Sequence, residues 1–366
     1  MPKGAYIGID NIAHKIKKGY IGIDGVARKI KKAYIGIGGV ARPCWSGGEL
    51  VYYGQLTPLS VARYELCATH VGDYALFGGG WNHSSRSYNV DVYDSSLIKS
   101  NADSLKYGYG ISFTATHTDY HAVFRNGEGI FIYNNYLTQT IIMVDTRNSI
   151  ISSCVGNYVL FSDNHTLECF NTSFMLVSSI TFQKSKSAAT HVGEYTLFGG
   201  GEDNDALYAF NTSLTQINST SLSIGRVRLA ATHVGDYALF GGGASSYSST
   251  DDGGTPQSIV DAYDKFLTRT IAESLSAPRY GLTATHVGDY ALFGGGVDGG
   301  AYTNFNMYNN VDSYDTYLSR TITTGLSIPK MNLAATHVGD YALFGGGKSS
   351  NYAGTSLSSV DAYTII

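Results

Sequence analysis

The 366-residue chain is poor in several residue types, and each shortage excludes a class of protein. Charged residues make up only 15% of the chain and hydrophobic residues 43%, a balance that excludes both intrinsic disorder and a coiled coil. Six prolines are too few for a proline-rich linker protein. Four cysteines, none of them in a CxxC pair, are too few and too scattered for a disulfide scaffold or a zinc site.

Long apolar segments are also missing. No run of about 18 apolar residues is present, so the sequence predicts no membrane-spanning helix. The first residues, MPKGAYIGID, lack the apolar core of a secretory signal peptide. Glycine and tyrosine are abundant instead, with 44 and 29 residues. Together with serine, they are typical of short strands joined by polar loops, which favours an all-β fold.

Charge is distributed unevenly along the chain. Residues 1–42 contain nine Lys or Arg and two Asp, a net charge of +7. The remaining residues contain 16 basic and 27 acidic side chains, a net charge of −11. This asymmetry predicts two domains with different electrostatic partners, a basic segment over residues 1–46 and an acidic domain over residues 47–366.

The basic segment repeats every 14 residues, as AYIGIDNIAHKIKK, GYIGIDGVARKIKK and AYIGIGGVARPCWS. Each unit reads as a strand, a two-residue turn and a second strand. In the first unit, Ile9 is expected to face Ile12 and Ile7 to face His14, which makes one face apolar. Isolated hairpins are marginal in water, so we expect an oligomer or a larger assembly to complete this anchor. The residues expected to carry the anchoring role are Tyr6, Lys17, Tyr20, Lys31 and Tyr34.

A longer repeat covers the acidic domain. Its core, ATHVGDYALFGGG, occurs four times unchanged and three times in altered form. The seven units parse into four strands each: an ATHV-type strand A, a YALFG-type strand B, a VDVYD-type strand C and an LTRTI-type strand D. The last unit ends at Ile366 without strand D, and residues 50–63 resemble the missing strand. The two chain ends are therefore expected to complete one blade of a closed ring.

The Gly-Gly doublet after strand B and the aromatic residue in strand C make the unit resemble a kelch repeat. This resemblance covers residues 50–366 and implies an all-β, seven-bladed β-propeller, although the Trp expected in strand D is missing. Separately, the YIGIDGVARKIKK repeats over residues 5–46 resemble N-terminal segments of uncharacterised virion or tail proteins of bacteriophages and prophages of Firmicutes. The second resemblance implies a place on a virus particle.

The third position of the core is occupied by His in six units and by Cys154 in the third unit. We expect a structural role for these histidines, buried and hydrogen-bonded between blades. A sevenfold ring of inner strands is expected to keep equivalent side chains too far apart to bind a metal. The six residues are His70, His117, His191, His233, His286 and His337.

A cation stands seven positions before this residue in six of the seven units, where strand D leads into strand A. A basic ring at one channel mouth could bind an anionic sugar or carboxylate. Alternatively, each cation pairs with an acid of strand C or of a loop and closes its blade. The residues are Arg63, Arg147, Lys184, Arg226, Arg279 and Lys330.

Loops between strands B and C are short in units two to four and long in units five, six, seven and one, which are neighbours in a closed ring. Because strands alternate in direction, these loops are expected to emerge on one face. Their Tyr, Ser, Gly and Asn resemble an antibody paratope, although surface loops also tolerate insertions without function. The expected contact residues are Trp81, Tyr88, Tyr247, Tyr302, Phe305, Tyr308 and Tyr352.

No phosphate loop, nucleophile elbow or HExxH motif is visible, so we expect neither an enzyme nor a cofactor. The sequence favours a virion accessory or receptor-binding protein, held on capsid or tail by residues 1–46 and binding a host-surface glycan or protein through the long loops. Nucleic acid is a less favoured partner, since the lysines lack a supporting motif. The alternatives are an intracellular kelch-type interaction scaffold and, third, a carbohydrate-active enzyme on a propeller.

Overall fold

The computed structural model describes most of the chain: the backbone of residues 6–9, 12–15, 19–23, 26–30, 32–37 and 40–46, and residues 48–105, 113–144, 151–163, 165–182, 187–201, 205–217, 219–248, 253–299, 305–349 and 355–366. Over these residues the secondary structure is entirely β, and no helix among them could cross a membrane. The chain divides into two compact units, residues 1–51 with 365–366 and residues 52–364. The predicted domain boundary at residue 46 stays a prediction.

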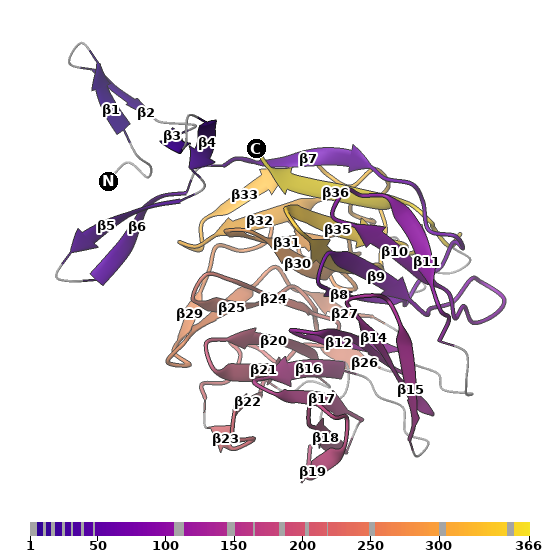
Figure 1. The fold of residues 1–366 in the computed structure, drawn as a ribbon. Coiled ribbons are helices and arrows are strands. Elements are labelled where there is room, and N and C mark those ends of the chain that lie inside the picture. The colour runs from indigo at the N-terminus through magenta and orange to yellow at the C-terminus, as the bar shows by residue number, and fades with distance from the viewer. Residues whose placement is uncertain are drawn as a thin grey trace. The chain divides into compact units, whose positions relative to one another are not determined.

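The first unit contains three hairpins, drawn in indigo in Figure 1. Their strands are β1 (Tyr6–Ile9) with β2 (Ile12–Lys15), β3 (Gly19–Ile23) with β4 (Val26–Ile30), and β5 (Lys32–Ile37) with β6 (Val40–Ser46). In the first hairpin Ile9 lies opposite Ile12 and Ile7 opposite His14, as the sequence predicts. The other two hairpins share this register next to the turn. Over the described residues each hairpin forms a two-stranded sheet of its own.

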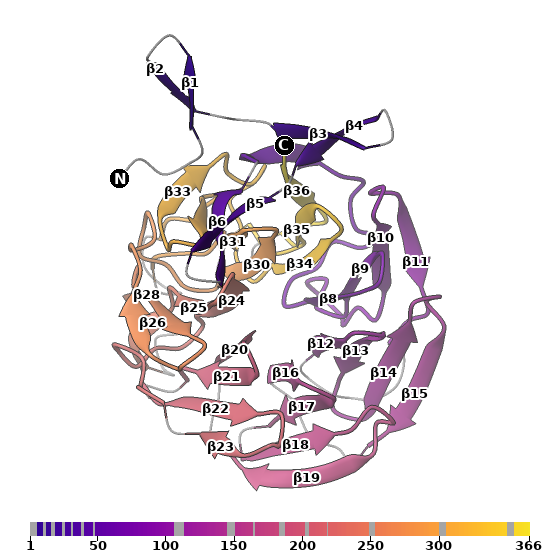
Figure 2. The ribbon, with the colours of Figure 1, turned by 60° about the vertical axis from the view of Figure 1, so that its left-hand side comes forward.

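The second unit is a seven-bladed β-propeller, which confirms the predicted fold class (Figure 2). Each blade is a four-stranded antiparallel sheet in which strands A to D follow one another from the channel outward. Blades 1 to 3 are β8 (Cys67–Val71), β9 (Tyr74–Gly78), β10 (Val90–Asp94) and β11 (Lys99–Ala102); β12 (Thr114–Thr118), β13 (His121–Arg125), β14 (Gly129–Asn134) and β15 (Gln139–Met143); and β16 (Ile151–Val155), β17 (Tyr158–Ser162), β18 (Thr166–Phe170) and β19 (Leu176–Thr181).

Blades 4 to 6 have the same layout, and a short extra hairpin follows strand B of blade 5. Their strands are β20 (Ala188–Val192), β21 (Tyr195–Gly199), β22 (Leu207–Asn211) and β23 (Gln216–Ile217); β24 (Ala230–Val234), β25 (Tyr237–Gly241), β28 (Val260–Asp264) and β29 (Arg269–Ile271); and β30 (Thr283–Val287), β31 (Tyr290–Gly294), β32 (Val311–Asp315) and β33 (Arg320–Thr323). The extra hairpin pairs β26 (Ala244–Ser248) with β27 (Gly253–Pro256).

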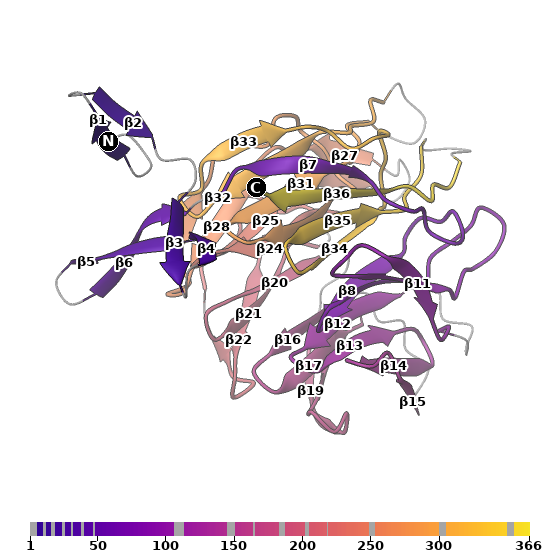
Figure 3. The same ribbon diagram turned by 45° about the horizontal axis from the view of Figure 1, so that its top comes forward.

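Blade 7 is built from both ends of the chain, as predicted. It consists of β34 (Ala334–Val338), β35 (Tyr341–Gly345), β36 (Val360–Ile365) and, as its outer strand, β7 (Leu50–Gln55). Figure 3 shows β7 beside β36. The Leu56 amide donates to the Val360 carbonyl at 2.9 Å, and the Tyr52 and Tyr363 rings pack edge to face at 5.3 Å. These contacts close the ring without leaving β36 as an exposed sheet edge.

The Phe-Gly-Gly end of strand B holds neighbouring blades together. Phe77 is fully buried and lies against Gly345 of the preceding blade, where a Cβ would be 2.7 Å from the ring. The next glycine, Gly346, has a φ of +70°, which glycine adopts at little cost. The amide of Gly347 then donates to the Arg63 carbonyl at 2.9 Å. The glycines are therefore required because adjacent blades approach closely at this level.

The inner strands bring the repeated histidines into contact with one another. His70 lies opposite Ala75 in the A–B hairpin. Its imidazole centroid is 4.0 Å from those of both His117 and His337, in the two neighbouring blades. The remaining described neighbours in the series are 4.0–4.3 Å apart. The expectation that these side chains are hydrogen-bonded between blades was wrong, because over the described residues the imidazoles contact one another and no hydrogen bond joins them to another protein group.

Candidate binding face

Strand pairing places the connections from strand D to strand A on the same side as the B–C loops. In blade 1, Cys67 at the start of strand A pairs with Gly78 at the end of strand B. The equivalent residues pair in the same way in blade 6, where Thr283 lies opposite Gly294. We call this side of the propeller the loop face. The A–B and C–D turns lie on the opposite side, which we call the turn face.

The cations that precede strand A are buried beneath the loop face rather than open at a channel mouth. Nη2 of Arg63 donates to Oδ2 of Asp91 at 2.7 Å and to the Phe77 carbonyl at 3.0 Å. Both charged side chains are fully buried. The same pairing occurs in three other blades, between Arg226 and Asp261 at 2.8 Å, Arg279 and Asp312 at 2.6 Å, and Lys330 and Asp361 at 2.8 Å.

This arrangement corrects the expectation of a basic ring for the four described members, because each is already paired with a strand-C carboxylate and shielded from solvent. The other two, Arg147 and Lys184, lie outside the described residues. Sequence reasoning left the strand-C aspartates out of its site residues. Strand C carries this Asp in blades 1, 5, 6 and 7, each of which also has a cation before strand A, and that coincidence was the available signal.

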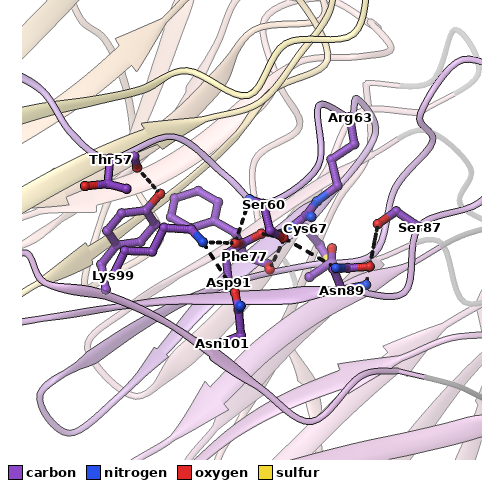
Figure 4. A network of polar contacts seen from close by, with 12 residues as sticks. Thr57, Ser60, Arg63, Cys67, Phe77, Ser87, Asn89, Asp91, Lys99 and Asn101 are labelled. Carbon is purple, nitrogen blue, oxygen red and sulfur yellow. Dashed lines mark hydrogen bonds and ion pairs between the residues drawn. The ribbon is translucent and has the colours of Figure 1, made fainter.

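Figure 4 shows the network around the Asp91 carboxylate. It accepts hydrogen bonds from the backbone amide and hydroxyl of Ser60 at 2.8 and 3.1 Å, and Nζ of Lys99 lies 2.8 Å away. Burial by itself raises the pKa of Asp91, but the Arg63 charge, Lys99 and the Ser60 amide together hold that pKa below its ordinary value. The carboxylate therefore stays charged and fixes the D–A link to strand C, directly under the loops.

The four long loops begin alike, with a bridge between the residue that follows the glycine run after strand B and a residue of the D–A link. The bridged pairs are Tyr64–Trp81, Val227–Ala244, Tyr280–Val297 and Met331–Lys348. Each loop then pairs with itself, through Trp81–Arg86, Val297–Met307 and Lys348–Ser356 and, in blade 5, through β26 and β27. The long loops are therefore ordered hairpin extensions at their bases.

Aromatic and cationic side chains meet where the loops of blades 7 and 1 adjoin. Trp81 exchanges backbone hydrogen bonds with Tyr64 at 2.8 and 2.9 Å. The guanidinium carbon of Arg86 lies 5.2 Å from the Trp81 ring centroid, and Nζ of Lys348 lies 5.2 Å from that of Tyr64. These distances are those of cation–π contacts. The junction therefore combines half-buried aromatic rings with two positive charges.

The blade 6 loop is organised around the Asp298 carboxylate. It accepts hydrogen bonds from the backbone N–H of Asn306 at 2.7 Å, from Nδ2 of Asn306 at 2.9 Å and from the Tyr308 hydroxyl at 2.7 Å. Burial raises the pKa of Asp298, but these bonds outweigh it and lower that pKa. Burial and the bond to Asp298 raise the pKa of Tyr308 to about 12. Phe305 packs beneath the loop on a buried cluster that includes Val297.

Backbone hydrogen bonds join the D–A links of blades 5, 6, 7 and 1 into one continuous arc. The amide of Gly281 donates to the Arg228 carbonyl at 3.1 Å, that of Asn332 to Gly281 at 2.9 Å, and that of Glu65 to Asn332 at 2.9 Å. All four residues have φ between +53° and +64°. We call these residues the inner arc. It spans the same four blades as the long loops and ties their bases together.

The structure describes four of the seven predicted contact residues. Trp81, Tyr88, Phe305 and Tyr308 lie in the long loops and are half-buried. The Tyr88 ring packs edge to face on Phe113 at 6.1 Å, on the blade 2 side. For Tyr247 only the backbone, in β26, is described, and Tyr302 and Tyr352 lie outside the described residues. In the anchor, the backbones of Tyr6, Tyr20 and Tyr34 are described, and Lys17 and Lys31 lie outside.

Comparison with models of known protein families finds no match for this chain, and comparison with curated protein sequences finds none either. The geometry of the described residues is therefore the basis for a functional proposal. Its main element is a set of aromatic-rich loops on four adjacent blades, whose bases are paired and tied together by the inner arc.

Proposed function

We propose that this protein is a non-enzymatic adhesin on a bacteriophage particle, which binds a host-surface glycan or protein through the loop face. The observation that carries the proposal is that the long loops and the inner arc occupy the same four adjacent blades. The inner arc runs through blades 5, 6, 7 and 1, each of which bears a long loop. Four adjacent loops on one shared base would offer the extended surface that recognition of a large ligand requires.

The side chains of this surface favour a polar, extended ligand such as a glycan. Trp81 and Tyr64 offer aromatic faces and edges for the apolar side of a sugar ring. Arg86 and Lys348, placed over these rings, supply positive charge for carboxylate or phosphate substituents. A protein ligand with acidic groups would use the same side chains, so the proposal includes both classes.

The kelch resemblance belongs to this proposal. It is supported by the buried strand-C aromatics and by the glycines that admit the neighbouring blade. The missing strand-D Trp weighs against close membership. A kelch-type fold serves binding in many settings, so an intracellular interaction scaffold with the same loop face is the alternative.

Residues 1–46 are proposed to attach the protein to capsid or tail. Three two-stranded sheets leave every hairpin with unpaired edges over the described residues, and such hairpins are marginal alone. Their net positive charge favours an acidic protein surface as the partner. Attachment would therefore cover the unpaired edges of the hairpins.

The test is density-gradient purification of particles from cells that make this protein, followed by mass spectrometry of the particle band. The full chain is expected in the band at a fixed ratio to the structural proteins. A chain lacking residues 1–46 is expected to fold and stay in the soluble fraction. If the full chain also stays soluble while structural proteins band, the intracellular scaffold becomes the better account.

A further inference from the structure

The inner strands of the propeller line a central cavity. Strand A of every blade contributes three successive residues, which form a layer of Ala or Ser, a layer of Thr or Ser, and a layer of His or Cys. The cavity has a volume of about 160 Å³. No carboxylate, Lys or Arg belongs to the described lining. Hydroxyl, thiol and imidazole groups are therefore the polar side-chain groups available to a guest.

The imidazoles follow the symmetry of the propeller. Neighbouring ring planes are inclined by 42° to 53°, close to the rotation of about 51° between blades of a sevenfold ring. The ring planes therefore run along the channel axis. Seven positions about 4 Å apart lie on a circle of about 4.7 Å radius, well beyond the roughly 2.0–2.1 Å of a zinc–imidazole bond.

This geometry excludes direct metal ligation on the axis. In agreement, no group of three His, Cys, Asp or Glu within the described ranges could hold a metal ion. A guest on the axis instead lies at a distance suited to hydrogen bonds from the surrounding nitrogens. A hard cation is also disfavoured, because the described lining contains no carboxylate.

The imidazole nitrogens are available for such bonds. Within the described part of the chain, no hydrogen bond joins any of the six rings to another protein group, and none of their nitrogens is sealed from the cavity. Burial lowers the pKa of these residues, to about 4 for His337 and, with help from other imidazoles, to about 4 for His117 and about 3 for His233. The rings are neutral at pH 7 and gain a second N–H donor on protonation.

We propose that the six-imidazole ring is a binding site for a small inorganic anion of halide size, which enters together with protons. An anion on the channel axis accepts N–H bonds from several imidazoles at once. Its charge offsets the mutual repulsion that otherwise opposes protonation of neighbouring rings. Binding and protonation therefore reinforce each other, and the affinity rises as the pH falls.

The groups around the ring set the direction of this coupling. Carboxylates of the A–B turns follow the histidines by three residues, except after His117, where the separation is two. They favour imidazole protonation and oppose entry of a free anion. They are Asp73, Asp119, Glu194, Asp236, Asp289 and Asp340.

The first residue of strand B follows each A–B turn and is also titratable in every blade: Tyr74, His121, Tyr158, Tyr195, Tyr237, Tyr290 and Tyr341. Cys154 completes the layer as a neutral thiol, because burial raises its pKa. Uptake is accordingly expected in acid and not at pH 8.

Thermal unfolding of the full chain in two sodium salts of equal ionic strength tests the proposal. One salt is chloride and the other a bulky organic sulfonate that is too large for the cavity. At pH 5, chloride is expected to raise Tm by at least about 2 °C over the sulfonate. The difference should disappear at pH 8. Equal Tm values in the two salts at pH 5 would overturn the proposal.

A ring variant locates the effect. His286→Leu removes the nitrogens while keeping a side chain of similar length, and it should abolish the chloride effect. His286→Cys is a second variant, since Cys154 shows that the layer accepts a thiol. The control is His165→Leu, an exposed histidine outside the ring, which should keep the effect. Loss of the effect in the control, or its survival in both ring variants, would place the anion elsewhere.

Crystals grown at pH 5 in sodium bromide give an independent readout. An anomalous peak on the channel axis at the level of the imidazoles is expected. Solvent alone at that position would contradict the assignment, whatever the thermal data show. Because this site lies in the channel and not in the long loops, neither experiment depends on the adhesin proposal.

Discussion

At the scale of single residues, the buried ion pairs decide whether each D–A link is fixed to its blade. In blade 5, the Asp261 carboxylate accepts hydrogen bonds from Nη2 of Arg226 and from both the backbone amide and the hydroxyl of Ser223. Asp261→Asn leaves the Arg226 charge buried without a countercharge. We expect a loss of about 3–5 kcal/mol in the free energy of unfolding, measured by urea denaturation.

Asp264→Asn is the matched control for this change. Asp264 lies three residues further along and is accessible to solvent, and Asn already occupies the equivalent position in blades 2 to 4, as Asn134, Asn171 and Asn211. The control substitution is expected to change the free energy of unfolding by no more than about 0.5 kcal/mol. Similar losses for the two variants would show that the ion pair adds nothing specific.

The imidazole ring makes stability depend on pH. Because the folded pKa of His337 is about 4, below its ordinary value, the unfolded chain binds more protons between roughly pH 6.5 and pH 4. Stability is therefore full above pH 6.5 and falls as the pH drops through this range. In the sulfonate salt, Tm of the wild type is expected to fall more steeply from pH 7 to pH 4.5 than Tm of His337→Leu. Parallel curves would contradict this assignment.

At the scale of elements, the C–D turns are held by one repeated side chain. Oδ1 of Asp264 accepts the amides of Phe266 and Thr268, both at 2.9 Å, and Leu267 takes a φ of +62° within the turn. Asp264→Ala removes both bonds and is expected to cost about 1 kcal/mol, measured by urea denaturation. Asp264→Asn should be neutral here too. An equal loss for Asn would mean that charge, and not the turn geometry, matters.

Strand order and pairing were predictable from the sequence because repeats leave little freedom. The VDAYD-type strand and the Gly-Asp turn recur in register, so the strands of a blade follow from local pattern alone. The burial of Arg63 was not predictable, because the same sequence spacing fits both an exposed ring of cations and a buried ion pair with an acid of strand C. Burial depends on how closely the next blade approaches. The contact between His70 and His117 depends likewise on the radius of the closed ring, which no local pattern contains.

At the scale of the whole molecule, β7 closes the ring by completing blade 7. A chain lacking residues 1–47 keeps β7 and is expected to melt at the same temperature as the full chain. A chain lacking residues 1–56 loses the outer strand of blade 7, which exposes the edge of β36. We expect a Tm lower by more than about 5 °C and aggregation in size-exclusion chromatography. Identical melting of the two truncated chains would show that β7 is dispensable.

The position of the loop face could be predicted from the sequence, but the contacts that its residues make could be predicted only in part. The clustering of long loops on adjacent blades was readable from loop lengths once closure was inferred. The inner arc was not, because positive φ at Glu65, Arg228 and Asn332 follows from contacts between blades and not from residue type. Tyr308 was predicted as a ligand-contact residue, whereas its hydroxyl donates a hydrogen bond to Asp298 within the loop, which the sequence did not indicate.

Binding of the fluorescently labelled full chain to cells of a panel of candidate host bacteria tests the central claim most directly. Trp81→Ala, on the loop face, is expected to reduce binding at least tenfold, as for a central aromatic anchor. Phe266→Ala, an exposed aromatic on the turn face, should leave binding unchanged. Both variants should melt close to the wild type. Unaltered binding of Trp81→Ala together with loss in Phe266→Ala would contradict the account and place the binding surface on the turn face.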